Sequence, residues 1–185
     1  MPVTHPPVLI IAPQSPALEA IAREVIAGAA EAVYTSPLLS PLTGSEVNLV
    51  SVVAAPLVFL GWRADNADSC QRAHQSLSEV ERLTPDPRYI AKFEASIGGG
   101  ASADPPDEMV AEASHFRPLG PIEPFAITAA PHGEEAVPCE LERARRWGAE
   151  MYTEWLSALG QPGRPNGRVE QSSSPRMLSW CGAME

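Results

Sequence analysis

The order of the short apolar runs is the feature of this chain that most constrains its fold. Such runs occur at residues 8–11, 57–60, 90–97 and 125–129, and residues typical of turns follow them. Near-continuous apolar strands are typical of parallel sheets that are covered on both faces. The stretches between the runs are helix-like, and strands that alternate with helices predict an α/β domain. In such open sheets, ligands bind beyond the carboxyl ends of the strands, so we expect function at that edge.

Three segments show the spacing of apolar side chains that is typical of amphipathic helices. They span residues 16–32, 64–83 and 138–159. Ser15 and Pro16 suit the N-cap and the first helical position of the first segment. We therefore expect these three helices to cover the sheet.

Weaker patterns complete the predicted domain. A second strand is expected at 32–35, a short helix or turn at 47–54 and a further helix at 107–116. Together with the four apolar runs, this predicts a three-layer, doubly wound sheet of five parallel strands. The domain is expected to span residues 1–160, and the Pro-, Gly- and Ser-rich residues 161–185 to form a flexible tail.

Composition narrows the class of protein. The 185 residues suit one domain, and a net charge of −10 argues against nucleic acid as a partner. No apolar run approaches the roughly 18 residues that span a bilayer, so no membrane partner is expected. The N-terminus lacks the basic start of a signal peptide, and a cytoplasmic location is the expectation. Cys70, Cys139 and Cys181 form no CxxC pair and no zinc spacing, so we expect reduced thiols and no metal.

Several segments resemble those of a known family when they are taken in order. Residues 8–22 read as a strand, a loop and a helix, and residues 95–100 end a strand in three glycines. In this order the chain resembles the flavodoxin-like family, and more closely the flavodoxins and the NAD(P)H-dependent FMN reductases. The resemblance covers about residues 8–159, and the segments that carry it are 8–22, 57–62, 95–100, 131–135 and 141–159.

The resemblance implies FMN as a cofactor, and a role in electron transfer or in NAD(P)H-dependent reduction of a small acceptor. In this family, hydroxyls and backbone N–H groups at the start of the first helix bind the phosphate, which assigns that role to Gln14, Ser15 and Ala17. The family pattern is Ser/Thr-x-Thr-Gly-x-Thr, whereas residues 12–17 read Ala-Pro-Gln-Ser-Pro-Ala. Proline has no N–H, so the loop lacks several phosphate donors and weaker phosphate binding is expected.

The same resemblance implies a site for the flavin ring between two strand ends. Trp62, in the loop expected after residues 57–60, would stack on the ring. Arg63 and Asn66, in the same loop, would reach its heteroatoms. The backbone at Gly98, Gly99 and Gly100 would approach a flat ligand closely because glycine has no side chain in the way. These residues complete the predicted cofactor site.

The sequence is also compatible with two other functions. The altered phosphate loop and the acidic charge favour a flavodoxin-like scaffold without flavin, acting as an accessory or interaction subunit. A small-molecule enzyme is the third hypothesis, because His132 and Glu134 follow one strand and Asp65 and Asp68 follow another. A histidine and a carboxylate could act as general acid and base. The expected partners are a small-molecule ligand and a redox partner protein, and a homodimer is left open.

Overall fold

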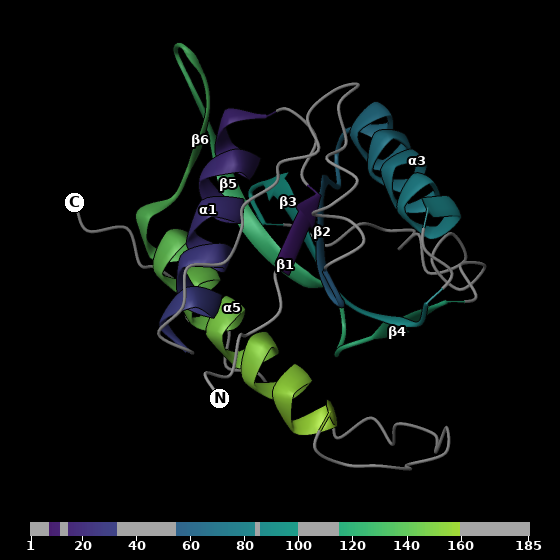
Figure 1. Cartoon of the computed structure of the whole chain (residues 1–185). Helices are drawn as coiled ribbons and strands as arrows, with labels where there is room; N and C mark the ends of the chain where they lie inside the picture. The colour runs from purple at the N-terminus through teal and green to yellow at the C-terminus, as the bar shows by residue number, and fades with distance from the viewer. Residues whose placement is uncertain (1–7, 12–14, 33–54, 84–85, 100–114, 160–185) are drawn as a thin grey trace.

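The computed structural model describes residues 8–11, 15–32, 55–83, 86–99 and 115–159. In this part of the chain a sheet lies between helices, with α1 and α5 on one face and α3 on the other (Figure 1). The elements are β1 (Val8–Ile11), α1 (Pro16–Glu31), β2 (Leu57–Arg63), α3 (Ala67–Leu83), β3 (Arg88–Ile97), β4 (Phe116–Pro118), β5 (Glu123–Ala130), β6 (Gly133–Ala136) and α5 (Pro138–Leu159).

The sheet is mostly parallel, as the apolar runs predicted. Its strand order is β1-β2-β3-β5-β6, and the short β4 pairs with β3. The pairs are parallel except for β5 and β6, which form an antiparallel hairpin. The predicted α/β class is confirmed, but the sheet has six described strands rather than five parallel ones. Because β2, β3 and β5 run in the same direction, their carboxyl ends lie at one edge.

Alternate side chains of the central strands build the two halves of the core. In β2, Leu57 and Phe59 pack toward α1 and α5, whereas Val58, Leu60 and Trp62 pack toward α3. This follows from the two-residue period of a strand, whose successive side chains point to opposite faces. Both faces of β2 are buried along its whole length, which explains why the sequence there is a continuous apolar run.

The predicted helices and strands differ from the structure mainly at their ends. Helix α1 begins at Pro16 as predicted, but Ala32 is its C-cap and does not begin a strand. Strand β2 continues to Arg63 rather than ending at Leu60. Helix α3 begins at Ala67 rather than residue 64, because the Asn66 side-chain oxygen accepts the Ser69 N–H at 3.0 Å and caps the helix there.

Two short strands were not predicted. Phe116, the expected end of a helix, lies in β4, where it is buried against the α3 side of the core and pairs with β3. Strand β6 has no apolar alternation and forms because β5 turns back on itself through Gly133. Residues 33–35 of the predicted second strand, 47–54, 107–114 of the predicted helix and the predicted tail lie outside the described residues. Among those described, no helix combines the length and apolarity needed to cross a membrane.

Candidate functional site

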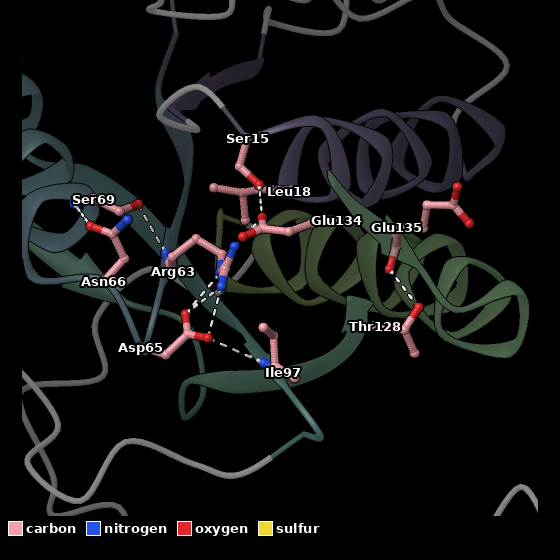
Figure 2. Close-up of polar contacts among 10 residues, drawn as sticks. All are labelled: Ser15, Leu18, Arg63, Asp65, Asn66, Ser69, Ile97, Thr128, Glu134 and Glu135. Carbon is pink, nitrogen blue, oxygen red and sulfur yellow. Dashed lines mark hydrogen bonds and ion pairs between the residues drawn. The ribbon is translucent and has the colours of Figure 1, made fainter. Parts of the chain in front are cut away.

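The carboxyl ends of β2, β3 and β5 bring a set of polar side chains together beside the start of α1. Figure 2 shows Arg63 at the centre of this set, with Asp65 on one side and Glu134 on the other. Arg63 ends β2, and Glu134 comes from β6, which packs beside α1. The edge at which we expected function is therefore the edge where these charges meet.

Arg63 is a buried cation held between two carboxylates. Only 5% of the residue is exposed. Its Nε donates to Asp65 Oδ1 at 2.8 Å, its Nη2 donates to Asp65 Oδ2 at 2.7 Å, and its Nη1 forms an ion pair with Glu134. Burial opposes the charge, but the bonds to Asp65 and Glu134 outweigh it and raise the pKa of the guanidinium. The bond from Arg63 lowers the pKa of Asp65, so this pair stays charged at neutral pH.

Ser15 connects Glu134 to the first turn of α1. Its Oγ accepts the Leu18 N–H at 3.4 Å, which makes Ser15 the N-cap of the helix as predicted. The same hydroxyl donates to Glu134 Oε2 at 3.1 Å, across 119 positions of sequence. The chain's own carboxylate therefore binds Ser15, one of the residues to which the family resemblance assigned the phosphate.

The end of β3 forms the other side of the edge. Gly98 and Gly99 have φ of +80° and +72°, a left-handed conformation that favours glycine. Ile97 is 53% exposed beside them, and its N–H donates to Asp65 Oδ2 at 3.4 Å. A Cβ on Gly98 would meet no atom within 4 Å. A Cβ on Gly99 would lie 3.1 Å from Ala126 Cβ, so the uncovered part of this turn is Gly98 and the Ile97 side chain.

The structure corrects the predicted role of Trp62. Trp62 lies within β2 and not in a loop, and it is 2% exposed in the core between the sheet and α3. Stacking on a ligand needs an exposed ring face, so the prediction that Trp62 stacks on a flavin is wrong for this conformation. The continuous apolar run through residue 62 was the signal that the strand extends this far.

Gln14 and Gly100 lie outside the described residues. Ala17 lies in the first turn of α1, is 1% exposed and packs into the core. The Asn66 side-chain oxygen caps α3. The group that was expected to reach a ring heteroatom is therefore already used in a hydrogen bond within the chain. Arg63 binds two carboxylates of its own chain, and Gly98 and Gly99 lie at the edge where we predicted them.

Among the described residues, no hydrogen bond or ion pair joins His132 to an aspartate. His132 is exposed in the turn between β5 and β6, while Asp65 bonds to Arg63 and to the Ile97 N–H. In the described part of the chain, no group of three or more His, Cys, Asp or Glu is placed to hold a metal ion. Burial, followed by the charge of Glu94, raises the pKa of the Cys70 thiol, which makes it a weak nucleophile at neutral pH.

The described side chains of this edge do not fit an FMN phosphate in this arrangement. A phosphate needs donors, and in the described part of this edge the Ser15 hydroxyl and the Nη1 of Arg63 already bind Glu134. A second anion beside that carboxylate would be repelled. This role of Glu134 was missed, because sequence spacing carries no information about a contact across 119 positions.

Comparison with solved structures identifies the fold. The chain has a flavodoxin-like fold. It is similar to a flavodoxin from the domain Archaea, with a TM-score of 0.55 and 13% identity over 80% of this chain and 97% of that one. It is also similar to the flavodoxin-like domain of a Synechococcus sp. protein, with a TM-score of 0.56 and 14% identity over 83% and 94%.

A third similar structure is a diflavin flavoprotein A3 from Nostoc sp., with a TM-score of 0.54 and 14% identity over 84% of this chain and 99% of that one. Neither a protein-family model nor a curated protein matches the sequence. The flavodoxin-like resemblance read from the strand ends is thus confirmed at the level of fold. The likeness to the NAD(P)H-dependent FMN reductases remains a prediction.

Proposed function

We propose that this flavodoxin-like protein acts without tightly bound FMN, as an accessory or interaction subunit rather than as an electron carrier. The observation that supports this is the position of Glu134. Its carboxylate accepts from Ser15 at the N-cap of α1 and pairs with Arg63, which is where an FMN phosphate would need its donors. Both donors are therefore already bound to a carboxylate of the chain itself.

The charges at the edge support the same conclusion. The cluster of Arg63, Asp65 and Glu134 has two carboxylates for one guanidinium, so a phosphate would enter a region that is already net negative. A charge-assisted hydrogen bond contributes about 1.5–3 kcal/mol, and about 1.4 kcal/mol is a tenfold change in affinity. The loss of the two donors that Glu134 occupies is therefore enough to weaken phosphate binding by orders of magnitude.

The test is a titration of the full chain with FMN, followed by visible absorption and by flavin fluorescence. We expect neither a shift of the flavin bands nor quenching at a large excess of FMN, and no yellow colour in the purified protein. An apo-flavodoxin that is titrated in parallel should show both changes. Stoichiometric FMN binding by the wild-type chain would refute the proposal.

FMN-dependent electron transfer, or reduction of a small acceptor with NAD(P)H, is the second candidate. The left-handed turn at Gly98 and Gly99, with the exposed Ile97 beside it, favours this function because it is open to a flat ring. The similar solved structures include flavodoxins by name. The same titration decides between the two candidates, since this function requires the spectral change that the first one excludes.

A further inference from the structure

Glu134 is held as a bound anion would be. Two donors from two other segments converge on its carboxylate: the Ser15 hydroxyl at the start of α1 and the Arg63 guanidinium at the end of β2 (Figure 2). Both donor residues are buried, at 9% and 5% exposure, whereas the Glu134 side chain is 32% exposed. The donors thus belong to the buried part of the edge, whereas the carboxylate that binds them is partly exposed to solvent.

The contacts of Arg63 with Asp65 explain why the guanidinium has room for one further anion at Nη1. Asp65 takes the Nε and Nη2 of the guanidinium in a two-point contact, which leaves Nη1 for a second partner. A buried guanidinium that keeps an N–H for a second oxyanion can bind a carboxylate or a phosphate with similar geometry. Glu134 is the oxyanion that the chain itself provides.

We propose that Glu134 is an internal competitor that fills an anion site made by Ser15 and Arg63, and that it thereby excludes the phosphate group of a phosphomonoester ligand. This inference rests on the proposed function, because it names the residue that keeps the edge closed. Because the Glu134 carboxylate binds both donors, a phosphate and the present position of this side chain exclude each other. Removal of the carboxylate should open the site without rebuilding the sheet.

The experiment compares Glu134→Ala with the wild-type chain and with Glu135→Ala. Glu135 is the neighbouring residue of the same strand, and its side chain is exposed, which makes it a matched control. Inorganic phosphate is the first probe, titrated by calorimetry against sodium chloride of equal ionic strength, and FMN is the second, followed by fluorescence quenching. We expect Glu134→Ala to bind both probes about tenfold or more tightly than the other two proteins.

A second variant keeps the test informative if Glu134→Ala does not fold. Glu134→Gln keeps the size of the side chain and removes its charge, so it should bind phosphate more tightly than wild type but less tightly than Glu134→Ala. Adding Arg63→Gln to either variant should abolish the gain, provided that circular dichroism shows the double variant is folded. For a double variant that is not folded, adding Ser15→Ala instead should reduce the gain.

Two outcomes would overturn the inference. Folded Glu134 variants that bind phosphate and FMN no better than wild type would show that the carboxylate is not what excludes them. A gain that appears equally in Glu135→Ala would show a general charge effect. The proposed function is tested by the wild-type chain alone and the inference by the ratio of variant to wild type, so the two failures are distinguishable.

Discussion

At the scale of single residues, two glycines determine how closely the helices on one face approach each other. A Cβ on Gly148 would lie 2.0 Å from the carbonyl oxygen of Val25, and a Cβ on Gly28 would lie 1.7 Å from that of Arg145. In both cases the neighbour is helix backbone, which cannot turn away as a side chain can. The helices α1 and α5 can therefore cross this closely only because neither position has a side chain.

Gly148→Ala should lower the free energy of unfolding by about 2–3 kcal/mol, because α1 and α5 must separate to admit the methyl group. Urea unfolding followed by circular dichroism measures the change. Glu150→Ala, at an exposed position of the same helix, is the control and should change the stability little. Equal stability of Gly148→Ala and wild type would contradict the close helix contact.

The charge pair at the end of β2 predicts a dependence of stability on pH. Arg63 holds the pKa of Asp65 below its ordinary value of 3.8. A carboxyl whose pKa is lower in the folded state stabilises the protein above its unfolded pKa, and this contribution is lost as the pH falls through the folded value.

We therefore expect Asp65→Asn to be less stable than wild type at pH 7 and the difference to shrink below about pH 4. Thermal unfolding between pH 2 and pH 7 provides the measurement. Asp68→Asn, at a nearby exposed aspartate, should show a smaller difference at neutral pH. A difference between Asp65→Asn and wild type that does not vary with pH would rule out the Arg63 pair as its source.

At the scale of elements, the Ser15 hydroxyl at the start of α1 makes two structural contacts. The Ser15 Oγ caps the helix at the Leu18 N–H and also holds Glu134 of the hairpin. The first contact is local and can be read from the sequence, whereas the second joins elements far apart along the chain. Substitutions at residue 15 should therefore affect both the helix and the β5–β6 hairpin.

Ser15→Ala should destabilise the protein by about 1 kcal/mol or more, since it removes the N-cap as well as the bond to Glu134. Hydrogen exchange should also rise in β6, and not only in the first turn of α1. Ser15→Thr retains a hydroxyl and should preserve most of both effects. If exchange in β6 were unchanged in Ser15→Ala, the bond to Glu134 would not be holding the hairpin.

At the scale of the whole molecule, the sheet carries a separate hydrophobic cluster on each face. Trp62 belongs to the cluster under α3, while Trp147 and Trp155 belong to the cluster under α1 and α5. The two clusters share the backbone of β2 and β3, whose alternate side chains enter one or the other. We infer that the two faces unfold together.

Tryptophan variants can test this cooperativity. Both variants also carry Trp180→Phe, because Trp180 lies outside the described residues. Trp62→Phe then leaves the tryptophans of the α1–α5 face, and Trp147→Phe/Trp155→Phe leaves the tryptophan of the α3 face. In each variant, the urea midpoints from fluorescence and from far-UV circular dichroism should coincide. Midpoints that separate in either variant would show that the faces unfold independently.

Much of the fold could be predicted because its longest signals are local. The bounds of β1 and α5 match the prediction, and α1 begins at the predicted residue, since apolar spacing and capping residues act over a few positions. The short strands β4 and β6 could not be predicted from their own composition. They are strands because β4 pairs with β3 and β6 pairs with β5. Trp62 was assigned to a loop because the predicted strand ended at Leu60, whereas β2 continues to Arg63.

The sequence by itself determined the α/β class, the mostly parallel sheet and the edge at which a site would lie, because these depend on periodicity along the chain. It also showed that residues 12–17 depart from the phosphate-loop pattern of the family that the chain resembles. Only the tertiary structure decided which group Ser15 and Arg63 hold, the Glu134 carboxylate. The physical reason is that a buried charge must find its partner in space, and that partner can come from any segment that the fold brings near.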